Sequence, residues 1–66
     1  MEILLNGQGQ ELSPSMTVAD LLDRLNFQPV RVAVEINEDL VPRKNYREVI
    51  LQAGDRVEIV TFVGGG

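Results

Sequence analysis

Residues 17–25, "TVADLLDRL", carry the clearest periodic pattern in the chain. Thr17 is a favourable helix N-cap, and Asp20 follows three residues later, as in a capping box. The apolar side chains recur at helical spacing on one face, namely Val18, Leu21, Leu22 and Leu25. A helix this short is marginal in water unless it buries its apolar face. The segment therefore predicts one helix that packs against another layer of structure.

Two strands are predicted before this helix. Residues 2–6, "EILLN", form a short apolar run that "GQG" at 7–9 interrupts. The following "QELS", residues 10–13, ends at Pro14. This order predicts a strand, a turn and a second strand, which together form a hairpin.

The segments after the helix complete the predicted sheet. Residues 31–37, "RVAVEIN", alternate between apolar and polar side chains, as in a half-buried strand. The rest is expected to be an irregular connection at 38–48, a short strand at 49–52, a turn at 53–55 and a last strand at 56–62. We predict an α+β fold in which the helix covers one face of a mixed sheet. Its expected core partners in the sheet are Ile3, Leu5, Val34, Ile36, Val57 and Ile59.

Composition excludes several classes of function. The 66 residues are enough for one domain, and they include no Cys and no His. Disulfides and the common zinc-ligand sets are therefore excluded, and so are the usual general base and the best nucleophile of enzymes. We expect no metal site, and we expect the chain to be no enzyme by itself.

Charge and hydropathy indicate which partners to expect. The net charge of −4 and the sequence pI of about 4.5 argue against nucleic acid and favour a partner protein with a basic surface. No apolar run approaches the ~20 residues of a membrane span, and no signal peptide is recognised. We therefore expect no membrane association and a cytoplasmic location, which the lack of Cys also fits.

Side-chain parity predicts a second, open face of the sheet. If Val57 and Ile59 face the core, then Glu58, Val60 and Phe62 face the other way. In the same way, Leu4 faces away from the core, because its neighbours Ile3 and Leu5 are expected to face it. An exposed apolar patch near the end of the chain is a candidate docking surface, with Glu58 helping to orient the partner.

The sequence ends in Val63, Gly64, Gly65 and Gly66. Glycine has no side chain, so such a segment can enter a narrow channel in a partner. Fully extended, it reaches ~13–14 Å beyond the last strand. An α-carboxylate is ionised at neutral pH. It must be activated, for instance as an acyl-adenylate, before a nucleophile can attack it. We expect residues 1–62 to form the domain and 63–66 to be a flexible tail.

The whole chain resembles the ubiquitin-like β-grasp family, and its details are similar to the ThiS family of small sulfur carriers. The similar stretches are "MEILLNG", "TVADLLDRL", "VAVEIN" followed by "LVPR", "AGDRVEIV" and the terminal glycines. The triple glycine departs from the glycine pair that would suffice. We take Gly65 and Gly66 as the functional pair and Gly64 as extra length.

The resemblance implies a mechanism and a set of partners. A ThiF-type adenylyltransferase would use ATP to form an acyl-adenylate at Gly66, while Val63, Gly64 and Gly65 lie inside partner sites. A sulfur-donating enzyme would convert Gly66 to a thiocarboxylate, and thiazole synthase, ThiG, would receive the sulfur for thiamin. The carrier itself would bind no cofactor and would be a monomer when alone.

Three alternatives stay open at this point. The same ending would suit a carrier for another pathway, such as the small subunit of molybdopterin synthase. It would also suit a protein modifier that forms isopeptide bonds through its last glycine. The third alternative is a β-grasp interaction module without any chemistry at its C-terminus.

Overall fold

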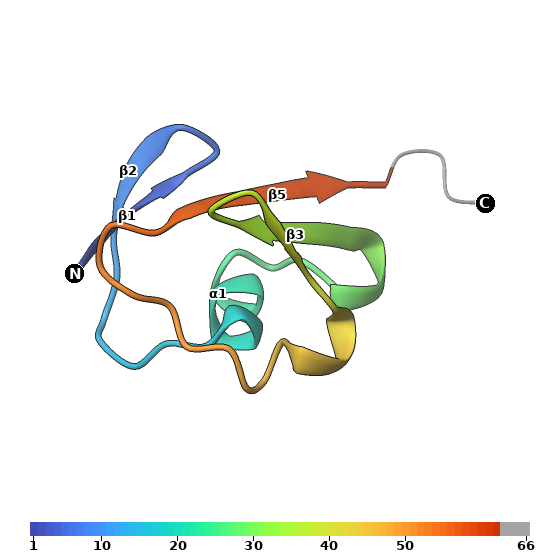
Figure 1. Cartoon of the computed structure of the whole chain (residues 1–66). Helices are drawn as coiled ribbons and strands as arrows, with labels where there is room; N and C mark the ends of the chain where they lie inside the picture. Colours follow the sequence, from blue (N-terminus) through green and yellow to red (C-terminus); the bar gives the residue numbers. More distant parts are fainter. Residues whose placement is uncertain (63–66) are drawn as a thin grey trace.

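The computed structural model describes residues 1–62, and these form a five-stranded mixed sheet with one α-helix on one face (Figure 1). The strands are β1 (Glu2–Leu5), β2 (Gln8–Glu11), β3 (Val32–Ile36), β4 (Asp39–Val41) and β5 (Arg56–Thr61). Their order across the sheet is β2-β1-β5-β3-β4. The β1–β5 pair is parallel and the other pairs are antiparallel, so the predicted mixed sheet is confirmed.

Helix α1 (Val18–Arg24) lies where the periodic pattern predicts it, and its capping box is complete. The Asp20 backbone N–H donates to the Thr17 hydroxyl oxygen at 3.1 Å, and the Thr17 N–H donates to the Asp20 carboxylate at 3.0 Å. Two short 3-10 turns, η1 (Pro29–Arg31) and η2 (Arg43–Asn45), occur in the connections. Within residues 1–62 no helix has the length and apolar character needed to cross a membrane.

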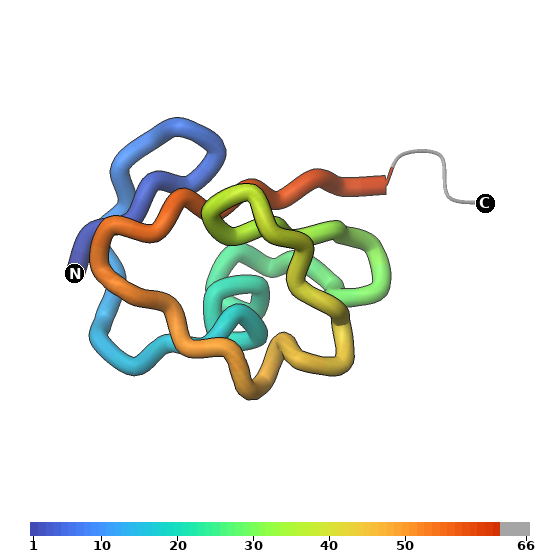
Figure 2. Tube along the Cα trace, viewed as in Figure 1, coloured from blue at the N-terminus to red at the C-terminus, as the bar shows by residue number. Residues whose placement is uncertain are grey.

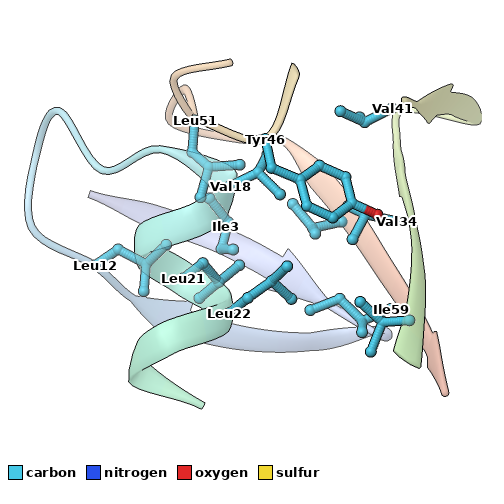
Figure 3. Close-up of a cluster of buried hydrophobic side chains, with 12 residues drawn as sticks. Ile3, Leu12, Val18, Leu21, Leu22, Val34, Val41, Tyr46, Leu51 and Ile59 are labelled. Carbon is cyan, nitrogen blue, oxygen red and sulfur yellow. The ribbon is translucent and has the colours of Figure 1, made fainter. Parts of the chain in front are cut away.

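The core lies between α1 and the sheet, and side chains from both layers project into it (Figure 3). Its buried members are Ile3, Leu12, Val18, Leu21, Leu22, Val32, Val34, Val41, Tyr46, Leu51, Val57 and Ile59. Seven of the ten predicted core residues are among them. The other three, Leu5, Leu25 and Ile36, are only partly buried and pack at the margin of the cluster.

The prediction of a short strand at 49–52 is wrong. Residues 42–55 instead run alongside the N-terminal end of α1 and return to β5 (Figure 2). The N–H groups of Val18 and Ala19 donate to the carbonyls of Val49 and Tyr46, at 3.0 and 2.8 Å. Because the backbone groups of this segment bond to the start of the helix, they are not available to pair with a neighbouring strand.

Two hairpins differ from their predicted positions. The first turn is Asn6–Gly7, so Gly9 lies inside β2 rather than in the turn. The second turn is Asn37–Glu38. Strand β4 follows it directly and lies within the segment that was predicted to be irregular. All four turn residues have positive φ, at 50° and 82° in the first turn and 52° and 73° in the second. Two-residue hairpin loops favour such turns because their twist matches that of the strands.

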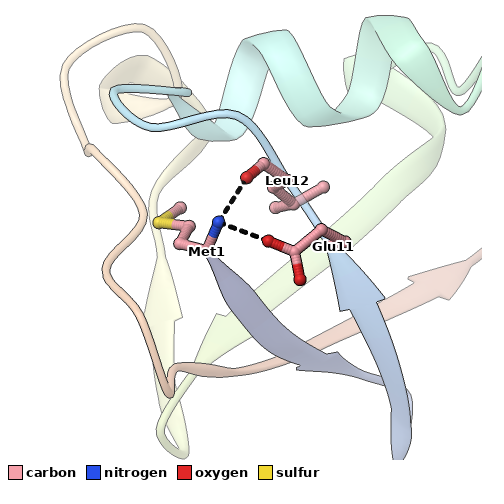
Figure 4. A network of polar contacts seen from close by, with 3 residues as sticks. All are labelled: Met1, Glu11 and Leu12. Carbon is pink, nitrogen blue, oxygen red and sulfur yellow. Dashed lines mark hydrogen bonds and ion pairs between the residues drawn. The ribbon is translucent and has the colours of Figure 1, made fainter.

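The N-terminal end of the chain is tied to β2 (Figure 4). The Met1 ammonium donates to the Glu11 carboxylate at 2.6 Å and to the Leu12 carbonyl at 2.7 Å, while the Leu12 N–H donates to the Met1 carbonyl. These bonds hold the open end of the β1–β2 hairpin together. They also help to fix Leu12 where it enters the core.

Candidate functional site

Strand β5 is central in the sheet and carries the chain towards its C-terminal end (Figure 1). It pairs with β3 from Val57 to Thr61, but with β1 only at Arg56 and Val57. The far half of β5 therefore extends beyond the β1–β2 hairpin, with β3 on one side. Beyond Val57, β5 holds Glu58 and Val60, and Phe62 follows directly after the strand.

The open face is present as predicted. Val60 and Phe62 are 59% and 57% exposed, and Glu58 is exposed between the buried Val57 and Ile59. The alternation of buried and exposed residues along β5 confirms the parity argument. These three side chains follow one another on one face of β5 and lead directly to residue 63.

Leu4 is exposed on the same face, but it lies at the other end of it. Its Cα partner in β5 is Arg56, four residues before Val60. At ~3.3 Å per residue, Leu4 lies about 13 Å from the level of Val60 along the sheet. The structure therefore groups Glu58, Val60 and Phe62 and separates Leu4 from them.

Sequence reasoning missed three exposed apolar side chains, Leu40, Val30 and Ile50, which are 66%, 60% and 51% exposed. Leu40 pairs with Glu35, which in turn pairs with Glu58, so all three share one row of the open face. The alternation of "DLV" after Asn37 was a usable signal for β4. Pro42 directly after it favoured an irregular connection instead, and an Asn-Glu turn is a weaker hairpin signal than Asn-Gly.

The open face is acidic at its centre. Glu35 and Glu58 are directly opposed on neighbouring antiparallel strands. Within residues 1–62, no ion pair involves either carboxylate. Like charges directly opposed across strands destabilise a sheet, and a cationic group placed above them would relieve the repulsion. The electrostatics of this face therefore suit a basic surface with apolar pockets around it.

Asn6 anchors β5 beyond the last β1 residue. Its side-chain Oδ1 accepts from the Ile59 N–H at 2.9 Å, and its Nδ2 donates to the Ile59 carbonyl at 3.3 Å. The side chain thus bonds both backbone groups of Ile59 that face the side of β1. On the opposite side of β5, the Phe62 N–H donates to the Arg31 carbonyl at 2.9 Å. The backbone is held in place up to the point where the tail begins.

The predicted reacting segment lies outside the described residues. It comprises Gly66 as the sulfur attachment site and Val63, Gly64 and Gly65 as the inserted tail. What the structure defines is the place from which this segment departs. That place is the end of a central strand, beside the exposed Phe62.

An open pocket of about 510 Å³ lies elsewhere, against the outer side of α1. Its lining includes Asp20, Asp23, Phe27 and Arg47, and none of the predicted site residues. In the part of the chain that the structure describes, no group of three or more Asp or Glu side chains is arranged to hold a metal ion.

Comparison with known proteins adds evidence that includes the tail. The family model described as "ThiS family" matches residues 3–66. A protein of Escherichia coli named sulfur carrier protein ThiS is 33% identical, with both chains covered in full. The crystal structure of the thiamine biosynthesis protein ThiS from Geobacter metallireducens covers all of both chains, with 32% identity and a TM-score of 0.86. A Paramagnetospirillum magneticum protein named thiazole synthase is 44% identical over 66 residues, and the chain spans only 20% of its length.

Proposed function

Because the chain belongs to the ThiS family, we propose that it is a sulfur carrier in thiamine biosynthesis. Its mixed sheet with one helix is the ubiquitin-like β-grasp fold. The carrier would present its C-terminal glycine to partner enzymes, which perform the chemical steps. The molecule itself supplies a docking face and a segment narrow enough to enter their sites.

The observation that carries this proposal is the extent of the family match. The match runs to residue 66 and so includes the terminal glycines as well as the folded domain. A β-grasp module without C-terminal chemistry would need only the domain. The names of the relatives favour the thiamine pathway over the molybdopterin pathway.

The proposed chemistry begins at the carboxylate of Gly66. One carboxylate oxygen attacks the α-phosphorus of ATP in the partner's site, and pyrophosphate leaves. The resulting acyl-adenylate has a good leaving group, since AMP can depart when a sulfur nucleophile attacks the carbonyl carbon. A hydrosulfide equivalent then takes the place of AMP, and the product is a thiocarboxylate. Sulfur is a softer nucleophile than oxygen, which suits this group to donate its sulfur in a later step.

The proposed partners follow from these steps. A ThiF-type adenylyltransferase would bind ATP and form the adenylate, so the carrier needs no cofactor of its own. A sulfur-donating enzyme would then supply the hydrosulfide equivalent. Thiazole synthase is the proposed acceptor, and the name of the Paramagnetospirillum relative supports it, because a segment similar to this chain lies within that protein. The exposed Glu58, Val60 and Phe62 would contact the adenylating partner beside the tail.

The test is an assay of the intact carrier with a ThiF-type enzyme and ATP. We expect pyrophosphate release that depends on all three components. After a sulfur donor is added, the intact mass should rise by one oxygen-to-sulfur exchange, located on Gly66 by fragmentation. A carrier that supports no pyrophosphate release, or that gains sulfur elsewhere, would contradict the proposal. High-molecular-mass conjugates in cell extract would point instead to a protein modifier.

A further inference from the structure

We infer that the edge of β5 facing β1, at its last residue Thr61, is a strand-addition site for an extended segment of the adenylating partner. The inference rests on the proposed function, because that function requires a partner to hold the tail that follows Thr61. In strand addition, main-chain hydrogen bonds provide the affinity, and pockets for alternate side chains provide the specificity.

The hydrogen-bond direction along β5 is set by its pairing with β3. The Phe62 N–H donates to the Arg31 carbonyl, and the Arg56 carbonyl accepts from the Asn37 N–H. Even-numbered residues of β5 therefore direct their backbone groups towards β3. Backbone groups alternate in direction along a strand, so those of Thr61 point the opposite way, towards the side of β1.

On the β1 side, each odd-numbered position before Thr61 already has a partner. The carbonyls of Asp55 and Val57 accept from the N–H groups of Leu4 and Asn6. Both backbone groups of Ile59 are bonded by the Asn6 side chain. Thr61 is the next position, and no residue within 1–62 pairs with it on this side. Strand β1 and the Asn6 side chain bond β5 only as far as Ile59, so the backbone groups of Thr61 on this side have no partner within residues 1–62.

This edge lacks the features by which proteins usually protect an open strand. Exposed edges are commonly kept short or carry charges or proline. The outer edge strand β4 has three residues, includes Asp39 and is followed by Pro42. The side chains of Val60, Thr61 and Phe62 carry no charge, and none of these residues is proline. The residues from Val60 to Val63 are β-branched or aromatic, which favours an extended backbone.

The position of the edge indicates what covers it. Thr61 is two residues before the tail that the proposed function delivers to the adenylating enzyme. A strand of that enzyme paired at Thr61 would set the direction of the tail. We therefore assign the edge to this partner rather than to a second copy of the chain.

Amide hydrogen exchange of the wild-type carrier tests the inference directly. In the free carrier, the Thr61 amide should exchange quickly, while the Phe62 amide is slowed by its bond to Arg31. Saturation with the adenylating enzyme should slow exchange at Thr61 by roughly tenfold or more. A Thr61 amide that exchanges equally fast in the free and saturated states overturns the inference. Protection at Thr61 that already accompanies dimerisation of the free carrier also overturns it, in favour of a second copy.

A pair of variants separates the backbone from the side chain. Thr61→Pro removes the N–H that faces the open side, and no hydrogen bond within residues 1–62 depends on that N–H. Thr61→Val removes the hydroxyl but keeps the N–H. We expect Thr61→Pro to bind the enzyme about tenfold more weakly than Thr61→Val, because the two variants share the loss of the hydroxyl and differ in the N–H. Equal affinity of Thr61→Pro and wild type would contradict strand addition.

These outcomes are distinguishable from a failure of the proposed function. If the wild-type carrier is adenylated but its Thr61 amide is not protected, only the strand-addition site is wrong. If the wild-type carrier is never adenylated, the proposed function itself fails. The two readouts are pyrophosphate release and residue-resolved exchange, and neither depends on the other.

Discussion

At the scale of the residue, Leu22 is the clearest test of the core. Its side chain is fully buried between α1 and the sheet. Leu22→Ala should lower the free energy of unfolding by about 2–5 kcal/mol, because the lost methyl groups leave a cavity. Urea denaturation measures this loss, and Leu40→Ala is the matched control, since Leu40 is 66% exposed. A Leu22→Ala loss below about 0.5 kcal/mol, the range of surface changes, would show that Leu22 is not a core residue.

Periodicity predicts single residues well where the pattern is regular, and poorly at its ends. Val18, Leu21 and Leu22 were placed correctly because one helical face faces the sheet. Leu25 is only partly buried because it is the C-cap residue, one position beyond the last turn of α1. Tyr46 is buried with no periodic signal around it, since its position depends on how residues 42–55 cross the helix.

At the scale of the element, Glu38 offers a stabilising substitution. Its φ of 73° is left-handed, and a residue with a Cβ pays about 1–2 kcal/mol there. Glu38→Gly should relieve this strain, less the greater entropy that glycine loses on folding. We expect a net gain in unfolding free energy of about 0.5–1 kcal/mol. Glu38→Gln is the control for charge, and an equal gain in that variant would contradict the conformational explanation.

The two hairpins show which elements the sequence could predict. Three of the strands follow apolar runs and were predicted within one or two residues, namely β1, β3 and β5. Strand β4 is short and its turn lacks glycine, so no local signal outweighed Pro42 nearby. The sequence contains the Asn6–Gly7 turn signal. Because "GQG" has a second glycine, Gly9, the turn was predicted at 7–9, whereas Gly9 lies in β2.

At the scale of the whole molecule, the open face can be tested separately from the fold. Val60→Asp places a charge on the exposed face without disturbing the core. We expect binding to the adenylating enzyme to weaken by about tenfold or more, with little change in Tm. Ile50→Asp is the control, because Ile50 is 51% exposed but lies beside Thr17 rather than on the sheet face. Equal effects of both variants, or unfolding by Val60→Asp, would contradict the docking surface.

The arrangement of the candidate site could be predicted only in part from the sequence. Parity along β5 predicted the exposure of Val60 and Phe62, because alternation needs no tertiary information. The separation of Leu4 from them depends on the register between β1 and β5, which no local pattern encodes. The clasp between Asn6 and Ile59 joins residues 53 positions apart, and for the same reason it was not predicted.

The last prediction concerns the tail. Gly65 precedes the proposed reacting residue, so under this proposal its backbone would enter the partner's site together with Gly66. Gly65→Val adds a branched side chain there, and even a 1 Å displacement of the reacting carboxylate can cost about 100-fold in rate. We expect pyrophosphate release to fall by about that factor, while Tm stays unchanged because the buried core consists of residues between Ile3 and Ile59. Gln10→Val introduces the same residue at an exposed position of β2, away from the tail, and should release pyrophosphate at nearly the wild-type rate. Wild-type activity of Gly65→Val would mean that the glycines are not required for entry, and the proposed role of the tail would be lost.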